Sequence, residues 1–372
     1  MEKKKTLKDM LLHRSILTPT FFFILLSLLL IAIFTTSCEK DQELLTEEQE
    51  EGKHLKDAGH LFIGCCNMAN SKIEVYDSQY YTSFDQSGSL KWSWAPTTAL
   101  GFTSTEISAW AHPYSVKRRM SSVWPGSTQV VAAASRDGLC TICRFVGGTV
   151  GQKLWAKNVG SGVYPHGIEI LPNGNVAIAG RKNGAGGWIR VYTSSQGPTS
   201  GNYANYNLDW AHEVLWDPAY NRLWAIGEVP GGPTDILVAL IVGGTAAAPT
   251  LTEDLSMRAI LPSTGGHDIA AFYYDVDKLW ITDHNGVYIY DKTTKTFTNS
   301  PGASFRTDVK GISNQPIGHI VQAKPNNALC TLNTWCTIKA EFWDGTTGAW
   351  LYNRTRTGAA FYKCKVWWYA YQ

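Results

Sequence analysis

The sequence predicts an all-β fold, and within that class a β-propeller of six four-stranded blades. Three observations support this prediction: a composition rich in glycine and tryptophan, a strand–turn–strand unit that recurs along the chain, and incomplete sets of strands at the two ends of the repeated region. Seven blades are the alternative count.

The composition favours short strands joined by turns. Hydrophobic residues make up 44% of the 372 residues and charged residues only 17%, so the chain can bury a large core. The 34 glycines and 15 tryptophans favour strands and turns over helices. We therefore expect one large β domain.

A strand–turn–strand unit recurs along the chain. It is clearest between His166 and Gly180, where two apolar stretches flank a Pro-Asn-Gly turn. Comparable units begin at His212, at His267 and at Lys310, and a weaker one begins near Arg119. The starts lie 43 to 55 residues apart, which is the length of a four-stranded antiparallel blade.

The two ends of the repeated region complete each other. Residues 60–94 supply three strands without an innermost one, and residues 361–371 supply one strand with nothing left to pair with. If the C-terminal strand completes the first blade, both deficits disappear and two exposed sheet edges are removed. This closure gives the count of six.

Residues 1–37 are typical of a lipoprotein signal peptide. Five basic residues precede an apolar run over 21–34, which is too short for a bilayer span but suits a signal sequence. Thr36, Ser37 and Cys38 follow, and small residues before a cysteine resemble a lipobox, with Thr35 where that motif usually has Leu. We predict lipidation at Cys38. An ordinary cleaved signal and an uncleaved anchor are the alternatives.

The mature chain is then expected in the cell envelope, lipid-anchored to the outer membrane on its periplasmic or cell-surface face. Residues 38–57 are rich in Asp and Glu and form an acidic tether, and residues 58–372 form the propeller. The net charge of the propeller, near +4, is too small and too scattered for a nucleic-acid partner. We expect a monomer whose partners are the membrane lipid and an acidic oligosaccharide.

Seven cysteines follow Cys38, so they cannot all pair within one chain. Cys330 and Cys336 could close a short loop in an oxidising compartment. Cys140 and Cys143 form a lone C-x-x-C without a second pair or a nearby histidine, which argues against zinc. For most of the cysteines we expect buried free thiols on strands.

The repeated phrases also resemble a known family. H-G-I-E-I-L-P-N-G at His166, A-H-E-V-L-W-D around His212, G-G-H-D-I around His267 and W-S-W at 92–94 look like an uncharacterised family of Bacteroidota β-propeller lipoproteins. The resemblance covers roughly residues 60–370 and implies the fold and the compartment, but no defined reaction. The chain departs from the family at Lys117-Arg118-Arg119, where a more acidic stretch is expected.

The first residue of each repeat defines the candidate site, because equivalent residues of the innermost strands share one depth in the central channel. This register places a ring of cationic or metal-binding side chains around the channel. The ring reads Arg119, His166, His212, His267 and Lys310, with Lys363 or Lys365 as its sixth member.

Three readings of this ring stay open. His166, His212 and His267 could jointly hold one divalent metal such as Mn, Zn or Ca, or act as catalytic acid/base groups. Without a metal, the ring could bind the carboxylate or sulfate of an acidic sugar. In the third reading the histidines only bond to backbone carbonyls or water and fill the channel.

Lesser candidates surround the ring. Glu213 and Asp268 each follow a ring histidine and are candidate substrate-binding groups or general bases. His284 reads as a turn residue. Four aromatic residues in predicted connections are candidates for stacking on sugar rings, although packing is the more usual role of such residues. They are Tyr80, Tyr81, Trp110 and Tyr114.

The sequence therefore predicts an envelope propeller that acts on or binds acidic glycans through its cation-lined channel. It could be a metal-assisted lyase or hydrolase. The alternative is a non-catalytic receptor for glycans or partners. No serine nucleophile elbow, phosphate loop or dinucleotide-binding glycine pattern is present.

Overall fold

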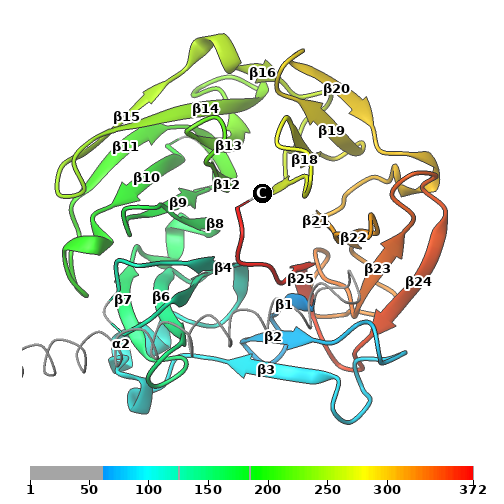
Figure 1. Ribbon diagram of the computed structural model, residues 1–372, viewed down its shortest axis with the longest axis horizontal. Helices are drawn as coiled ribbons and strands as arrows, with labels where there is room; N and C mark the ends of the chain where they lie inside the picture. The colour runs from blue at the N-terminus through cyan, green and yellow to red at the C-terminus, as the bar shows by residue number, and fades with distance from the viewer. Residues whose placement is uncertain (1–61, 125, 184–185, 372) are drawn as a thin grey trace, which may run out of the picture. The chain divides into compact units, whose positions relative to one another are not determined.

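The protein was analysed as a computed structural model, which describes residues 62–124, 126–183 and 186–371. Six antiparallel sheets are arranged as a β-propeller, so the predicted six-bladed fold is confirmed (Figure 1). The predicted signal peptide, Cys38 and the acidic tether lie outside the described residues. No helix among the described residues is long and apolar enough to cross a membrane.

Blades 1 and 2 are built from the first strands and the last one. Blade 1 has the order β25 (Phe361–Val366), β1 (Ile63–Asn67), β2 (Lys72–Tyr76) and β3 (Leu90–Trp94). Blade 2 contains β4 (Pro113–Met120), β5 (Gln129–Ser135), β6 (Leu139–Val146) and β7 (Lys153–Asn158). Between them lie the 3-10 turn η1 (Thr98–Leu100) and the short helix α2 (Ser104–Ser108).

Blades 3 and 4 follow in chain order. Blade 3 contains β8 (Pro165–Ile170), β9 (Val176–Gly180), β10 (Trp188–Tyr192) and β11 (Tyr203–Asn207), with η2 (Ser161–Val163) and η3 (Ser194–Gln196) in its connections. Blade 4 contains β12 (Asp209–Asp217), β13 (Arg222–Glu228), β14 (Asp235–Gly244) and β15 (Pro249–Glu253). The two-residue strand β16 (Ala259–Ile260), after η4 (Leu255–Met257), also pairs with β14.

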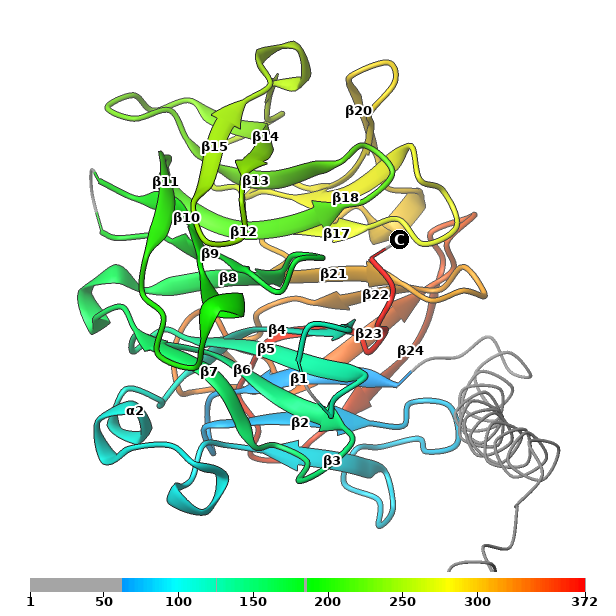
Figure 2. The ribbon, with the colours of Figure 1, turned by 60° about the vertical axis from the view of Figure 1, so that its left-hand side comes forward.

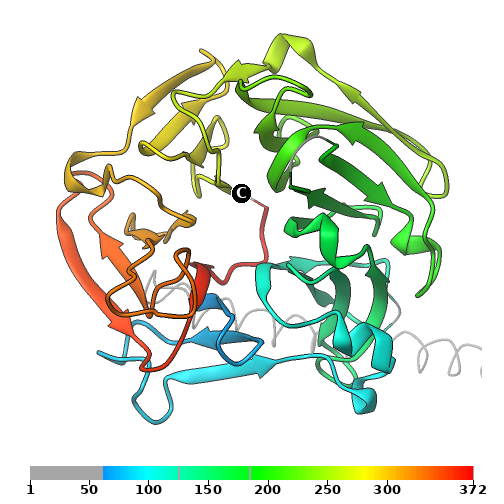
Figure 3. The same cartoon turned by 180° about the vertical axis from the view of Figure 1, so that it is seen from behind.

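Blades 5 and 6 complete the ring. Blade 5 contains β17 (Asp268–Ala271), β18 (Lys278–Thr282), β19 (Val287–Asp291) and β20 (Thr296–Asn299). Blade 6 follows η5 (Gly302–Ser304) and contains β21 (Gly311–Asn314), β22 (Ile320–Ala323), β23 (Lys339–Trp343) and β24 (Trp350–Thr355). Figure 2 shows the sheets in succession, and Figure 3 shows the ring from its opposite face.

The C-terminal strand closes the ring as predicted. β25 pairs antiparallel with β1, with Ile63 opposite Val366 and Cys65 opposite Cys364. The first blade thus takes its innermost strand from the end of the chain, so β1 is paired on both sides, with β25 and with β2.

The hydrophobic core lies between neighbouring blades. Strands that face a blade on either side have no polar face, so β5 reads Val-Val-Ala-Ala-Ala and is buried throughout. Between blades 2 and 3, for example, Ile142 and Trp155 pack against Ile168 and Ile178. Each sheet is therefore stabilised mainly by apolar contacts with its two neighbours.

The cysteines divide as expected from the sequence. Cys330 and Cys336 form a disulfide six residues apart, and the five other cysteines of the described residues are free and buried. Burial raises the pKa of Cys140 and Cys143 well above its ordinary value, so both thiols stay protonated.

Candidate functional site

A pocket of about 520 Å³ opens at one mouth of the central channel. Every blade contributes at least one residue of its innermost strand, or the residue just before that strand, to the pocket wall. From blade 2 around to blade 1 these residues are Tyr114, His166, His212, His267, Lys310 and Tyr362, which we call the ring residues.

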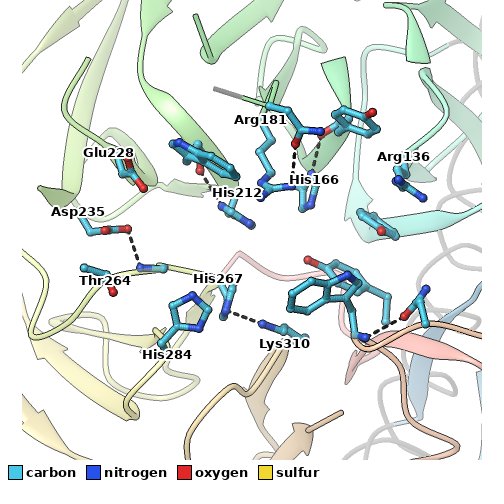
Figure 4. Close-up of a pocket in the computed structure, with 18 residues that line it drawn as sticks. Arg136, His166, Arg181, His212, Glu228, Asp235, Thr264, His267, His284 and Lys310 are labelled. Atoms are coloured by element: carbon cyan, nitrogen blue, oxygen red, sulfur yellow. Dashed lines mark hydrogen bonds between the residues drawn. The ribbon is translucent and has the colours of Figure 1, made fainter. Parts of the chain in front are cut away.

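The ring residues contact one another in sequence. Tyr362 stacks on Tyr114 at 4.0 Å between ring centroids, and Tyr114 meets the edge of His166 at 4.8 Å. The His166 and His212 centroids lie 4.7 Å apart, and those of His212 and His267 lie 5.3 Å apart. The Lys310 ammonium then donates to Nε2 of His267, as Figure 4 shows.

The ring differs from the predicted register in two blades. In blade 2 the position belongs to Tyr114 and not to Arg119, because Pro113-Tyr114 begins β4 as Pro165-His166 begins β8. In blade 1 it belongs to Tyr362, one residue before the predicted Lys363. The three histidines and Lys310 do line one pocket together.

An unusual backbone conformation precedes four of the ring residues. The residue two positions earlier has a positive φ in each case: Tyr164 (51°), Trp210 (52°), Gly265 (71°) and Asp308 (57°). Bulky residues rarely adopt this left-handed conformation, and it costs of order 1–3 kcal/mol for each of them. Its repetition shows that the surrounding structure holds these loops in one geometry.

Backbone carbonyls of two of these residues fix the tautomer of two histidines. Nδ1 of His166 lies 2.6 Å from the carbonyl oxygen of Tyr164, and Nδ1 of His212 lies 2.6 Å from that of Trp210. Since a carbonyl oxygen only accepts, each Nδ1 carries the proton and each Nε2 keeps its lone pair. Burial, followed by nearby positive groups, lowers the pKa of both imidazoles well below 6.5, so both are neutral at pH 7.

Three cations face the pocket without an ion-pair partner. The Arg181 guanidinium lies over the Trp210 ring at 4.1 Å, and that of Arg136 lies over the Tyr164 ring at 5.1 Å. Neither arginine, nor Lys310, forms a salt bridge within the described parts of the chain. Nε of Arg181 is also buried without a hydrogen-bond partner there. Burial lowers the pKa of Lys310 to about 8.

Two carboxyl groups lie on another side of the same pocket (Figure 4). Glu228 and Asp235 stand directly opposite each other on β13 and β14. One oxygen of Asp235 accepts from the backbone of Gly265 at 3.1 Å and of Gly266 at 3.0 Å, while its other oxygen is buried without a partner. Burial raises the pKa of both carboxyl groups, and the negative charges of Asp235 and Asp209 raise that of Glu228 further.

A possible metal-binding cluster borders the pocket. His267, His284 and Asp308 place one ligand atom each within 4.8 Å of the others. Nδ1 of His284 lies 2.9 Å from Asp308, and Nδ1 of His267 is buried without a partner. His284 lies in the turn between β18 and β19, as predicted, and it also lines the pocket. The predicted ligands His166 and His212 lie outside this cluster, and each directs Nδ1 to a backbone carbonyl, which leaves Nε2 as the nitrogen with a lone pair.

Below the ring, buried charges span the channel. Glu169 binds Arg119 through two hydrogen bonds of 2.9 and 2.7 Å. Lys363 bridges Glu213 at 2.7 Å and Asp268 at 3.1 Å. We call the full set the channel network; it comprises Lys117, Arg119, Glu169, Glu213, Asp268, Lys363 and Lys365.

The channel network accounts for five residues that the sequence analysis assigned to substrate binding. Arg119, Glu213, Asp268, Lys363 and Lys365 all lie outside the pocket wall, and their side chains are at most 14% exposed. In the full network each of the three carboxylates, from blades 3, 4 and 5, pairs with at least one of the four cations of blades 1 and 2. Lys310 is the member of the predicted substrate-binding set that does face the pocket.

The C-terminal segment covers the other end of the channel, and Figure 1 shows it reaching the centre of the ring. Arg119 donates to the carbonyl of Ala370 at 3.2 Å, and its guanidinium lies 4.6 Å from the centroid of Tyr371. The Tyr371 hydroxyl donates to Ile170 at 2.8 Å. The cavity beside this segment measures about 40 Å³, room for roughly one water molecule. Ligands therefore reach the ring residues from the pocket side.

The four aromatic candidates have different environments. Trp110 is buried, and its indole N–H donates to Ser71 at 2.8 Å, so it is a packing residue. Tyr80 is 76% exposed but, like Tyr81, does not line the pocket. The prediction placed Tyr114 in a connection between strands, which is wrong. Tyr114 is a buried residue of β4 and belongs to the ring residues.

Comparison with known proteins assigns the chain to a family. Residues 21–342 match the family described as "Family of unknown function (DUF6528)". The chain belongs to the DUF6528 family. This confirms the resemblance at the level of a family of unknown function, whereas a lipoprotein identity stays a prediction. No curated protein matches this DUF6528 chain.

Solved structures share its fold at low sequence identity. A protein of unknown function from Bacteroides caccae has 10% identity and a TM-score of 0.51, over 82% of this chain and 98% of that one. A functionally unknown protein from Desulfotomaculum acetoxidans has 9% identity and a TM-score of 0.47, over 80% of each chain. Hydrazine synthase from Kuenenia stuttgartiensis has 12% identity and a TM-score of 0.47, over 74% of this chain and 71% of that one. The first similarity supports the fold of the DUF6528 chain and nothing beyond it.

Several pocket residues of this DUF6528 chain were missed by sequence reasoning. Arg136, Arg181, Glu228 and Asp235 lie at or beyond strand ends, where the repeat pattern carries no signal. For Tyr114 the sequence did carry a signal, because Pro113-Tyr114 matches Pro165-His166 in the next repeat.

Proposed function

We propose that the pocket binds the carboxylate or sulfate groups of an acidic oligosaccharide. The observation that carries this proposal is the set of three cations, Arg136, Arg181 and Lys310, that face one pocket without an ion-pair partner among the described residues. Charged groups held partly out of water are normally paired, so an anionic ligand supplies the missing partner.

The arrangement suits an extended ligand with both charged and hydroxyl groups. The two guanidinium groups are held in place by the Tyr164 and Trp210 rings, so little side-chain freedom is lost when an anion binds. The Nε2 lone pairs of His166 and His212 accept hydrogen bonds from hydroxyl groups. A pocket of about 520 Å³ holds one or two sugar units.

The experiment compares binding of trigalacturonate and of neutral maltotriose by titration calorimetry. Arg181→Ala should weaken trigalacturonate binding by about ten- to one-hundred-fold, the scale of a lost charge-assisted hydrogen bond. Arg190→Ala is the matched control, because Arg190 also stacks on aromatic rings, at 4.1 and 4.2 Å, but lies outside the pocket. Hyaluronan and alginate oligosaccharides extend the panel. A wild-type protein that binds none of the acidic sugars would refute the proposal.

A metal-assisted reaction is the second candidate, favoured by the cluster of His267, His284 and Asp308. Two imidazoles and one carboxylate are ligands typical of zinc or manganese, whereas calcium prefers oxygen alone. The anion proposal ranks first because Lys310 already donates to Nε2 of His267. A metal using that nitrogen must displace the ammonium.

Elemental analysis after dialysis against zinc or manganese tests this second candidate. The wild type should retain about one metal ion per chain, and His284→Ala should retain none. His112→Ala is the control, because His112 forms a comparable pair with Asp137 at 2.8 Å without a third ligand in the cluster. Absence of metal in the wild type would exclude the metal-assisted reaction.

A catalytic role would make the protein a lyase or hydrolase. A neutral histidine with a free Nε2 is suited to accept a proton, and Glu228, whose pKa is raised by burial, is suited to donate one. Product analysis of each acidic oligosaccharide after incubation separates this role from binding alone. Intact oligosaccharides would favour the non-catalytic receptor.

We also propose that the chain is an envelope lipoprotein anchored through Cys38. The support is the sequence of a basic head, a 14-residue apolar run and a cysteine after small residues. Cys38→Ala should move the protein to the soluble fraction or stall its processing. Membrane-bound Cys38→Ala protein after normal cleavage would contradict the anchor.

A further inference from the structure

Trp335 is held at the pocket by a short covalent loop. Cys330 and Cys336 close this loop, and both are buried. Within the loop the backbone N–H of Trp335 donates to Oδ1 of Asn333 at 2.8 Å. Asn333 and Trp335 both line the pocket. The loop therefore places a large aromatic side chain beside the ring residues.

The exposure of Trp335 sets it apart from the other aromatic residues of the pocket. Its side chain is 48% exposed, whereas the ring residues Tyr114 and Tyr362 are 5% and 4% exposed. Of the strongly exposed large apolar side chains among the described residues, Trp335 is the one that lines the pocket. The ammonium of Lys310 lies 5.1 Å from its ring centroid. An open indole thus adjoins one of the unpaired cations.

We propose that Trp335 is the stacking platform for one pyranose ring of a uronic-acid oligosaccharide whose carboxylate is bound by Lys310. This inference rests on the proposed function, because it takes the anionic group in the pocket to belong to a sugar. The C–H face of a pyranose carries a slight positive charge, and the face of an indole is negative, so the two attract when stacked. An acidic sugar therefore satisfies the indole and the ammonium together, which an inorganic anion does not.

The disulfide is what keeps the platform in place. Apart from its two cysteines the loop contributes little to the core, since Leu332 is 49% exposed. A loop with so few apolar contacts opens easily unless it is tied, and the covalent link removes most of its alternative conformations. Reduction should therefore release Trp335 without unfolding the blades.

The first experiment measures trigalacturonate binding by titration calorimetry for Trp335→Ala and Trp335→Phe. Trp335→Ala should weaken binding by about ten-fold, which is the low end of the effect that alanine substitution has on nucleobases stacked on aromatic side chains. Trp335→Phe should retain most of the affinity, because a smaller aromatic face remains. Trp350→Ala is the matched control: Trp350 is 54% exposed and lies on the outer strand β24, outside the pocket.

The result separates this inference from the function on which it rests. If Trp335→Ala binds trigalacturonate like the wild type while Arg181→Ala does not, the stacking platform is refuted and the anion site stands. If the wild type binds no acidic oligosaccharide, both are refuted. Sulfate competition provides a further check, because Trp335→Ala should leave the affinity for inorganic sulfate unchanged within about two-fold.

The second experiment removes the covalent link. A variant with Cys330→Ser and Cys336→Ser should lose trigalacturonate affinity to about the same extent as Trp335→Ala, and adding Trp335→Ala to it should cause no further loss. Circular dichroism at the assay temperature verifies that the variant is folded. Unchanged trigalacturonate affinity in the folded double-serine variant would refute the positioning role of the disulfide.

Discussion

Replacing Glu213 with Gln should strongly destabilise the propeller, although the substitution preserves shape and hydrogen-bonding capacity. The Glu213 carboxylate is fully buried and lies 2.7 Å from the ammonium of Lys363 and 3.2 Å from that of Lys117. Without its charge, the four cations of the channel network face two carboxylates instead of three. Breaking a buried ion pair in this way costs about 3–5 kcal/mol, because a charge is left uncompensated out of water.

The corresponding change in melting temperature follows from the size of the domain. An unfolding entropy of about 2.1 cal/mol/K per residue, over roughly 310 residues, converts 3–5 kcal/mol into a decrease of about 5–8 °C. Thermal unfolding at pH 7, followed by circular dichroism, measures it. Asp275→Asn is the control, because Asp275 pairs with Lys278 at the surface and such pairs contribute about 0–1 kcal/mol.

A double variant sharpens the test. Adding Lys363→Met to Glu213→Gln removes one of the excess cations, so it should restore part of the lost stability. A Glu213→Gln protein that melts within about 1 °C of the wild type would show that the channel network carries no net stabilisation.

Three further predictions concern acid stability, the ring loops and ring closure. Burial alone would raise the pKa of Glu213. The positive charges of Lys117 and Lys363 outweigh this effect and hold the pKa of Glu213 below its ordinary value of 4.5. The advantage of the wild type over Glu213→Gln should therefore be complete above pH 4.5 and shrink as the pH falls below it, in urea titrations at several pH values. Gly265→Ala should destabilise the fold, because a Cβ there would lie 2.0 Å from His284, and any zinc that the wild type retains should be lost with it. Gly358→Ala, with a similar φ and open space, should show only backbone strain of about 1–2 kcal/mol. Deletion of residues 361–372 should prevent cooperative unfolding at the wild-type temperature, since it removes the innermost strand of blade 1; an unchanged melting temperature would refute closure.

The fold could be predicted from the sequence because the blade repeat is a local pattern. The strand–turn–strand unit around Pro172-Asn173-Gly174 recurs at His212, His267 and Lys310 with other turn residues, and more weakly near Arg119. Closure by β25 was also predictable, because the two ends of the repeated region each have an unpaired strand, and pairing these strands with each other completes blade 1.

The candidate site was only partly predictable, for physical reasons that differ between residues. His166, His212 and His267 share a repeat position and therefore a depth in the channel. Arg119 was misplaced because the repeat of blade 2 is weak and its start was assigned too late along β4. In the structure Tyr114 has that position, and Arg119 lies deeper, where Glu169 pairs with it.

Other features of the site leave no trace in the sequence. The left-handed backbone at Trp210 is invisible there, because glycine is the usual sign of that conformation. Arg181 reaches the pocket through its contact with Trp210, which depends on how two loops pack in three dimensions.

The composition of blade 1 from both ends of the repeated region has a consequence for when the site comes into existence. A chain that emerges N-terminus first can form five blades before β25 appears. Until then the pocket wall has no Tyr362, and Glu213 and Asp268 have no Lys363. We therefore expect a nascent or truncated chain to lack the binding activity proposed for the pocket, and the appearance of that activity to mark the completed ring.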